Sequence, residues 1–214
     1  MQQLWDVLVL DLDGTLLCGL GEVSDQNIHA LDAVRDAGIE VVVATGRSFE
    51  ECKHILNLIH HQGISITAGG SALHDSDGKV IDCETLSFDI VKEVSENVIA
   101  NTLRCLLLKD PSHCDAQYVL VGNAPLHHAS SWWFETLNIS CLEATSIEDD
   151  PWPNHTLRVG AVAEESELKP IAELLEKTLI DRAKMQHWSA VTCSEATGSQ
   201  THLLEVFNKD VNKW

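Results

Sequence analysis

Basic residues are scarce in this chain. Its 214 residues include 14 Lys and Arg against 33 Asp and Glu, which gives a formal net charge of −19 at pH 7. So negative a protein repels the phosphates of nucleic acids and anionic membrane surfaces, and this excludes both as partners. The charge also disfavours anionic substrates at long range. A phosphate site would therefore have to be made locally, from backbone N–H groups, a few cations and a metal ion.

Paired cysteines and long apolar runs are lacking as well. The seven cysteines are scattered, odd in number and without a C-x-x-C pair, which argues against a disulfide framework or a zinc knuckle and favours reduced thiols. No apolar run approaches the ~20 residues that span a bilayer. No signal peptide is visible before the first apolar segment, so we predict a cytoplasmic protein. A hydrophobic content of 44% suits a folded chain with one sizeable core or two smaller ones.

Two aspartates, Asp11 and Asp13, follow the apolar residues 4–10. That segment predicts a strand covered on both faces in a parallel α/β sheet, whose carboxyl edge is where ligands bind. Alternation along the strand puts both carboxylates on one side, where they must share a proton or a cation such as Mg²⁺. One could attack an electrophile while the other passes a proton. An Asp-rich turn without chemistry is the plain alternative.

A second β-branched segment, residues 39–48, ends in the same way. Thr45 and Gly46 follow its apolar run, and Ser48 with Glu51 predicts a capping box at the start of a helix. A phosphoryl group could meet the Thr45 hydroxyl, the Gly46 N–H and the positive end of this helix. A simple strand-to-helix turn would need only the glycine and the cap.

The apolar strand before DLDGTLL and the ATGRS that follows at this distance resemble the first two motifs of the haloacid dehalogenase-like phosphatase superfamily. Residues 64–82 resemble the segment that leads into the cap of its Cof-like, type IIB members. The resemblance implies that Asp11 is the nucleophile that becomes an aspartyl phosphate and that Asp13 is the general acid/base. It also implies that Thr45 and Gly46 bind the phosphate.

Lys213 near the end of the chain resembles the lysine of the third motif, which follows a strand like residues 203–207. The resemblance implies that Lys213 balances the charge of the nucleophile and of the bound phosphoryl group, a task suited to a point charge with three donors. It further implies a Mg²⁺ cofactor held by Asp11 and Asp13. A solvated terminal lysine remains the alternative for Lys213.

The implied architecture is α/β, a Rossmann-like core with a parallel sheet, incomplete at the C-terminus, and an inserted α+β cap domain. We place the core at residues 1–82 plus 199–214 and the cap at 83–198, with linkers near 82–85 and 193–201. In the cap, Trp132 and Trp133 could line a substrate pocket or pack as one face of a helix. The other elements predicted from periodicity and turn residues are helices near 25–37, 49–59, 88–100 and 166–182, a hairpin turning at Asp77-Gly78, and cap strands at 103–108, 116–122 and 156–163.

The fourth motif of the superfamily is missing. It contains a Gly-Asp pair whose carboxylate helps to hold Mg²⁺, and no Gly-Asp dipeptide occurs in the chain. Asp11 and Asp13 alone are a thin ligand set for an ion that prefers six oxygens. The strand at residues 4–10 would also become an exposed apolar edge, open to pairing with another chain or a second copy.

We therefore predict a Mg²⁺-dependent phosphoric monoester hydrolase for small phosphomonoesters, such as a sugar phosphate, acting through an aspartyl phosphate. One alternative is a truncated or degenerate relative without turnover, serving as a binding or complementing module, or an incomplete fragment. Another is a phosphotransferase such as a sugar phosphomutase, which uses the same motifs.

Overall fold

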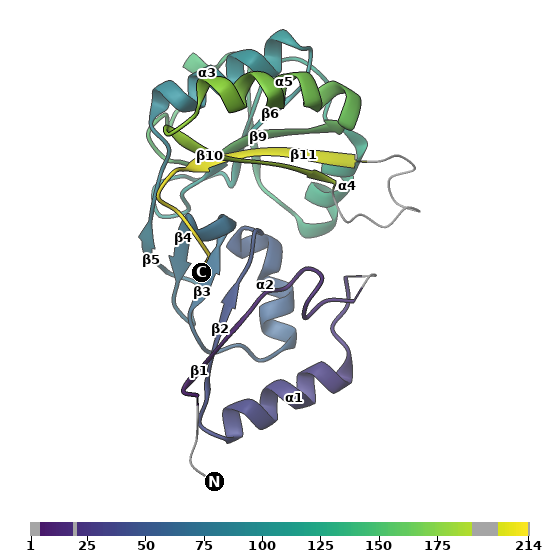
Figure 1. Cartoon of the computed structure of the whole chain (residues 1–214), viewed down its shortest axis with the longest axis vertical. Helices are drawn as coiled ribbons and strands as arrows, with labels where there is room; N and C mark the ends of the chain where they lie inside the picture. Colours follow the sequence, from purple (N-terminus) through teal and green to yellow (C-terminus); the bar gives the residue numbers. More distant parts are fainter. Residues whose placement is uncertain (1–4, 19–20, 190–200, 214) are drawn as a thin grey trace. The chain divides into compact units, whose positions relative to one another are not determined.

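The computed structural model describes residues 5–18, 21–189 and 201–213. The chain divides into two compact units, one formed by Met1–Cys83 with Asn212–Trp214 and the other by Glu84–Val211. Each unit has its own β-sheet flanked by helices (Figure 1). This confirms the predicted α/β class.

The first unit contains a sheet of five strands in the order β1-β2-β3-β4-β5. The first three strands are parallel, and the last two are added antiparallel as a hairpin that turns at Gly78, where φ is +80°. In chain order its elements are β1 (Val7–Leu10), α1 (Asp25–Asp36), β2 (Glu40–Ala44), α2 (Phe49–Leu58), β3 (Ser65–Thr67), the 3₁₀ turn η1 (Ala68–Gly70), β4 (Ala72–His74) and β5 (Val80–Cys83).

Both α1 and α2 cover the same face of this sheet (Figure 1). The three parallel strands are added in one direction, and right-handed crossovers then place both connecting helices on one side. Leu31 of α1 and Ile55 of α2 are buried in one cluster with Val41 and Val43 of β2. This cluster is the core of the first unit.

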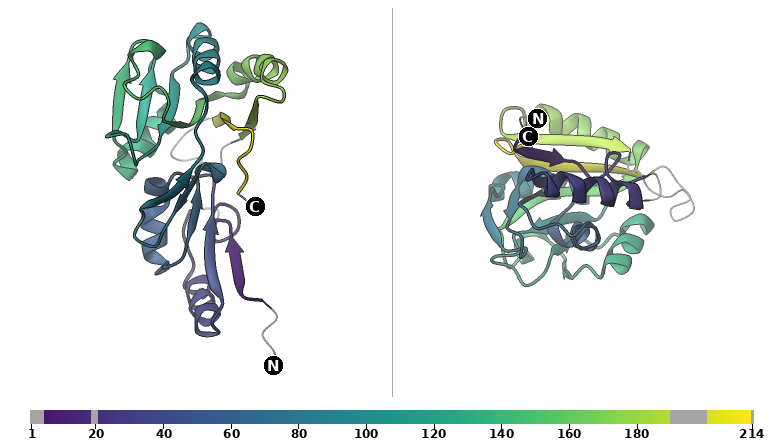
Figure 2. Two further views of the ribbon diagram at one scale, coloured as in Figure 1. Left: turned by 90° about the vertical axis from the view of Figure 1, so that its left-hand side faces the viewer. Right: turned by 90° about the horizontal axis from the view of Figure 1, so that it is seen from below.

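The opposite face of β1 is open, which corrects the prediction of a strand covered on both faces. Leu8 and Leu10 pack against the core, whereas Val7 is 49% exposed and Val9 is 42% exposed. The reason is the one-sided placement of α1 and α2. β1 also lies at the edge of the described sheet (Figure 2), where it pairs with β2. Pairing of this edge with another chain stays a prediction.

The second unit contains a sheet of six strands in the order β10-β11-β9-β6-β7-β8. Neighbouring strands are antiparallel except β7 and β8, which are parallel and joined through α4. In chain order its elements are α3 (Phe88–Ala100), β6 (Cys105–Lys109), β7 (Tyr118–Val121), α4 (His128–Leu137), β8 (Cys141–Ala144), the 3₁₀ turn η2 (Ile147–Asp149), β9 (Thr156–Glu164), α5 (Glu165–Thr178), β10 (Ala183–Ser189) and β11 (Thr201–Asn208).

The helices of this unit cover both faces of its sheet. α3 and α5 lie side by side over one face (Figure 1), where Val159 and Ala161 of β9 are buried beneath them. On the other face Phe134 of α4 packs against Tyr118 of β7, with ring centroids 5.0 Å apart. Trp132 of the same helix is 39% exposed, so Phe134 is the aromatic residue that anchors α4.

The strand predicted at residues 203–207 exists as β11, but it belongs to the second unit. It pairs with β9 on one side and β10 on the other, and Leu204 and Val206 are buried in the core under α5. The chain therefore returns to the first unit at Asn212, not at residue 199 as predicted. The predicted linker at 193–201 falls almost wholly outside the described residues, and it joins two strands that are neighbours in one sheet. No helix in the described ranges is long and apolar enough to cross a membrane.

We expect the substitution Gly160→Ala to destabilise the second unit. An added Cβ at this position in β9 would lie 1.9 Å from the Leu204 carbonyl oxygen of β11, which belongs to a strand held on both sides and cannot move freely. Overpacking of this kind costs about 1–3 kcal/mol or more. The free energy of unfolding, from urea denaturation followed by circular dichroism, measures the loss.

Gly38→Ala serves as the matched control for Gly160→Ala. Gly38 has a φ of +78°, but an added Cβ there meets nothing within 4 Å. Left-handed strain alone costs about 1–2 kcal/mol. A Gly160→Ala protein as stable as the wild type would contradict the tight approach of β9 and β11.

Candidate active site

Two parallel strands of the first unit end side by side, and the candidate residues follow those ends. β1 and β2 pair in parallel, with Leu10 opposite Val43, so their carboxyl ends meet at one edge of the sheet. In α/β folds this edge of the sheet is where ligands usually bind, so polar side chains placed there can contact a ligand. Leu12 is fully buried in the core, while the side chains of Asp11 and Asp13 on either side of it are 24% and 44% exposed. The alternation predicted for the two carboxylates is present.

Asp11 and Lys213, which are 202 residues apart in sequence, form an ion pair. The Lys213 Nζ atom donates to Asp11 Oδ2 at 2.7 Å, and Asp11 Oδ1 accepts from the Leu12 backbone N–H at 2.9 Å. Both side chains of the pair are about three-quarters buried. The Asp11 carboxylate is thus held in place by one backbone donor and one cation.

Gly70 lets the C-terminal segment approach the first unit. Its φ is +106°, and an added Cβ would lie 2.5 Å from the carbonyl carbon of Asn212, the residue before Lys213. Only a residue without a side chain fits both the backbone conformation and this distance.

Asp13 is paired with Arg47, a contact that sequence reasoning missed. Arg47 Nε donates to Asp13 Oδ2 at 2.9 Å and Nη2 donates to Oδ1 at 2.6 Å, a two-pronged arrangement that fixes the plane of the carboxylate. The available signal was the arginine itself, which follows Thr45-Gly46 directly at the carboxyl end of β2. Both carboxylates of the candidate site therefore face a cation.

Thr45 and the start of α2 are held by local hydrogen bonds. Thr45 is fully buried, and its Oγ1 accepts from the Arg47 backbone N–H at 3.2 Å, which leaves the hydroxyl hydrogen for another acceptor. The predicted capping box is confirmed, because Ser48 N–H donates to Glu51 Oε2 at 2.7 Å and Glu51 N–H donates to Ser48 Oγ at 3.3 Å. These two N–H groups serve the helix itself. An anion here would have to use other donors.

Cys52 lies on α2 next to Glu51 and is fully buried. Burial, reinforced by the neighbouring Glu51 carboxylate, raises the pKa of its thiol to about 12. The thiol therefore stays protonated at neutral pH, and protonated thiols are poor nucleophiles. Cys52 is therefore a poor candidate for a nucleophile.

The donor set fits a magnesium ion poorly as it stands. Mg²⁺ prefers six oxygen ligands in octahedral geometry. Among the described residues, no third His, Cys, Asp or Glu side chain joins Asp11 and Asp13 in a group that could hold a metal. The two carboxylates are balanced by Lys213 and Arg47 instead. Their role as metal ligands stays a prediction.

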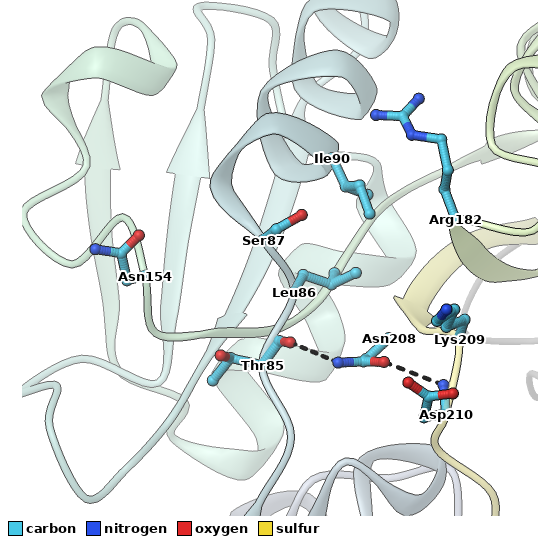
Figure 3. Close-up of a pocket in the computed structure, with 9 residues that line it drawn as sticks. All are labelled: Thr85, Leu86, Ser87, Ile90, Asn154, Arg182, Asn208, Lys209 and Asp210. Atoms are coloured by element: carbon cyan, nitrogen blue, oxygen red, sulfur yellow. Dashed lines mark hydrogen bonds between the residues drawn. The ribbon is translucent and has the colours of Figure 1, made fainter.

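A hollow lies within the second unit (Figure 3). It has a volume of about 430 Å³ and is lined by residues that include Thr85, Ile90, Arg182 and Asn208. Asn208 Nδ2 donates to the Thr85 carbonyl at 2.9 Å, which ties β11 to the segment before α3. Arg182 is ion-paired with Asp89 and Glu93 of α3. The charge of Arg182 is thus already balanced by two carboxylates.

Comparison with known proteins identifies the family. The family model for haloacid dehalogenase-like hydrolases matches residues 8–214, which is almost the whole chain. This chain belongs to that family. A HAD/COF-like hydrolase from Plasmodium vivax has the same fold, with a TM-score of 0.72 at 16% identity over 98% of this chain and 70% of that one. The predicted membership of the superfamily is confirmed, and its Cof-like branch stays a prediction.

Two curated relatives illustrate the range of the family. An HMP-PP phosphatase from Yersinia enterocolitica is 26% identical over 195 residues, which covers 90% of this chain and 66% of that protein. A 5-amino-6-(5-phospho-D-ribitylamino)uracil phosphatase from Bacillus subtilis is 31% identical over 86 residues, which covers 40% of this chain and 34% of that protein. The match thus spans about a third of the B. subtilis relative's length and two thirds of the Yersinia relative's.

We expect Gly70→Ala to break the ion pair between Lys213 and Asp11 by displacing Asn212. Lys213→Met should cost roughly 0.5–1.5 kcal/mol of unfolding free energy in the wild-type chain, because it removes a partly buried charged hydrogen bond. The same substitution should cost nothing further in the Gly70→Ala background. A double-mutant cycle on urea denaturation measures this non-additivity.

Gly38→Ala again provides the control background, because it adds left-handed strain without touching the C-terminal segment. There the cost of Lys213→Met should equal its cost in the wild type. Additive effects of Gly70→Ala and Lys213→Met would show that Gly70 does not position Lys213.

Proposed function

We propose that this chain is a phosphatase that hydrolyses small phosphomonoesters, with Asp11 as the nucleophile. The observation that carries the proposal is the Asp11–Lys213 pair at 2.7 Å. It joins a strand-end carboxylate to a cation from the far end of the chain, next to a second carboxylate held by Arg47. Family membership supports the same reading, as do relatives that are named as phosphatases.

The proposed reaction has two steps. In the first, an Asp11 carboxylate oxygen attacks the phosphorus; the new O–P bond forms, the bond to the leaving alcohol breaks, and protonated Asp13 gives that oxygen its proton. In the second, water attacks the aspartyl phosphate, Asp13 takes the proton from the water, and inorganic phosphate leaves with Asp11 restored. One carboxylate acts as nucleophile and the other as acid and then base.

The cations are what would let an anionic substrate approach so acidic a protein. Asp11 and Asp13 with Lys213 and Arg47 sum to no net charge, in a chain whose net charge is −19. Lys213 would balance the phosphoryl charge as it transfers to Asp11. The donor fork of Arg47 is engaged by Asp13, so Arg47 would act on the phosphate through its positive charge. The Thr45 hydroxyl and the Gly46 backbone complete the proposed phosphate site.

Magnesium remains a prediction for this chain. The family resemblance implies Mg²⁺, yet the described residues supply only two carboxylates, each facing a cation. Neither step of the proposed reaction uses the ion. Loss of hydrolysis on chelation with EDTA, and its return on addition of Mg²⁺, would establish the requirement.

We propose small phosphorylated metabolites as the substrate class. The relatives are named for different compounds of this kind, and the chain covers only part of their length. A phosphotransferase would use the same two carboxylates, and assays with water and with a sugar as acceptor separate the two. A cytoplasmic location and the lack of nucleic-acid and membrane partners remain predictions from composition.

Asp11→Asn should abolish hydrolysis of p-nitrophenyl phosphate, because an amide cannot form the acyl phosphate. The release of p-nitrophenolate, followed by its absorbance, measures the loss, which should reach at least a thousandfold in kcat (about 4 kcal/mol). Asp36→Asn is the matched control, since Asp36 is an exposed aspartate at the end of α1 in the same unit.

Full activity in Asp11→Asn would refute the proposed nucleophile. A wild-type chain without turnover, even with Mg²⁺ present, would instead favour the binding or complementing module.

Arg47→Ala should lower kcat more than it raises KM. Without the guanidinium the Asp13 carboxylate loses the two bonds that fix its plane, and misplacing a catalytic group by about 1 Å can cost 100-fold. Arg47→Lys should recover part of the rate, because it restores the charge without the fork. Steady-state kinetics with p-nitrophenyl phosphate give both constants.

Arg35→Ala is the control for Arg47→Ala, because Arg35 also pairs with an aspartate, Asp32, but on α1. It should leave both constants unchanged. Equal effects of Arg35→Ala and Arg47→Ala would show that general destabilisation, and not the placement of Asp13, explains the loss.

A further inference from the structure

A cluster in the second unit brings two imidazoles to one buried carboxylate. Asp110 follows β6 directly, and His155 directly precedes β9, so the antiparallel pairing of these two strands places the residues side by side. The Asp110 backbone N–H donates to the His155 carbonyl at 2.9 Å, which continues the ladder between the strands. His113 joins them because a tight turn after Asp110 folds it back.

The side-chain atoms of these three residues converge. His113 Nδ1 lies 2.7 Å from Asp110 Oδ2, and His155 Nδ1 lies 3.7 Å from the same oxygen. The two imidazole rings stack with centroids 4.4 Å apart. One ligand atom from each residue lies within 4.8 Å of the others, and this is the one such group of three or more potential ligands in the described ranges of the chain.

We propose that Asp110, His113 and His155 form a binding site for one zinc-class divalent ion, distinct from the phosphatase site of the first unit. Zinc takes imidazole nitrogen and carboxylate oxygen at about 2.0–2.2 Å, commonly from three protein ligands with a water in the fourth position. Ligand atoms around such an ion lie roughly 3.4 Å apart. An ion would therefore need the distance from His113 Nδ1 to Asp110 Oδ2 to widen from 2.7 Å, and the distance from His155 Nδ1 to the same oxygen to shorten slightly from 3.7 Å.

The exposure of the two imidazoles permits these small movements, since the His113 side chain is 59% exposed and that of His155 is 35% exposed. Asp110 is fixed, because its carboxylate is buried and Oδ1 accepts from the Ser112 N–H at 2.8 Å. The ion would take the place of the hydrogen now shared between His113 Nδ1 and Asp110 Oδ2. A rigid anionic ligand with two adjustable neutral ligands suits capture of a cation from solvent.

The surrounding charge does not oppose a cation. The nearest lysine in sequence, Lys109, is fully buried, and its Nζ pairs with Asp150 and donates to Thr156 Oγ1 at 2.7 Å. Its charge is thus compensated within the protein. The ion would cross-link the end of β6 to the start of β9, and binding energy of this kind adds to the stability of the fold that holds the ligands.

The choice of zinc over magnesium follows from the donors. Two of the three ligands are imidazoles, which suit Zn²⁺, Co²⁺ and Ni²⁺, whereas Mg²⁺ prefers oxygen. The pattern D-x-x-H with a further histidine 42 residues later does not by itself indicate a metal site. Strand pairing, and not spacing along the chain, brings these ligands together.

Calorimetric titration of the EDTA-treated full chain with Zn²⁺ tests the proposal, with the visible absorption of bound Co²⁺ as a second readout. We expect one ion per chain, no displacement by excess Mg²⁺, and binding weakened roughly tenfold or more by His113→Gln, His155→Gln or Asp110→Asn. His113→Cys should retain binding, because a thiolate also ligates zinc. His128→Gln, at an exposed histidine of the same unit, should change nothing.

Absence of binding in the wild type, or equal binding in the wild type and in the His113→Gln and His155→Gln variants, would overturn the site, the latter by showing adventitious surface binding only. Neither His113 nor His155 is buried, so both substitutions should leave the fold intact, and a failure of Asp110→Asn to fold leaves the test intact. The Asp11→Asn variant should bind Zn²⁺ as the wild type does. The two proposals can therefore fail independently.

Discussion

The contact between Lys213 and Asp11 is the constraint on which the arrangement of this chain depends. It closes a loop of 202 residues, and everything from Glu84 to Val211 is an excursion between two stretches of the first unit. The return needs space as well as charge. Gly70 provides the space, since any side chain there would collide with Asn212. Asp11, the proposed nucleophile, is separated in sequence from its counter-charge by the whole second unit, so the candidate site depends on the folding of both units.

The two carboxylates of the candidate site are each balanced by a cation, although basic residues are scarce in this chain. With only 14 basic residues against 33 acidic ones, the protein places two cations at the two carboxylates that follow β1. Lys213 meets Asp11 through one point contact, while Arg47 grips Asp13 through two. The difference matters chemically. A nucleophile needs an exposed lone pair, whereas an acid/base group needs a fixed orientation toward the leaving oxygen.

Local patterns in the sequence predicted those parts of the fold that depend on neighbours along the chain. The strand before Asp11, the capping box of Ser48 and Glu51, and the helix at 88–100 are all present. Asp11, Asp13 and Thr45 could be named because they follow strands whose ends must meet. Arg47 could not be assigned in this way, because its role rests on the path of a long side chain across to Asp13, which no periodicity encodes.

The less predictable parts depend on pairing between distant segments. β10, with the sequence AKMQHWS, has only a short apolar alternation, in which Ala183 and Met185 pack against the core, and its place as a strand depends on β11 beside it. Because β10 could not be predicted, β11 was assigned to the first unit. The predicted boundary between the domains was therefore placed at residue 199, before β11. The Asp110, His113 and His155 cluster was hidden for the same reason, since the pairing of β6 with β9 creates it. Reactive side chains at strand ends can be predicted to meet only when the order of the strands is known. The family resemblance supplied that order for the first unit but not for the second.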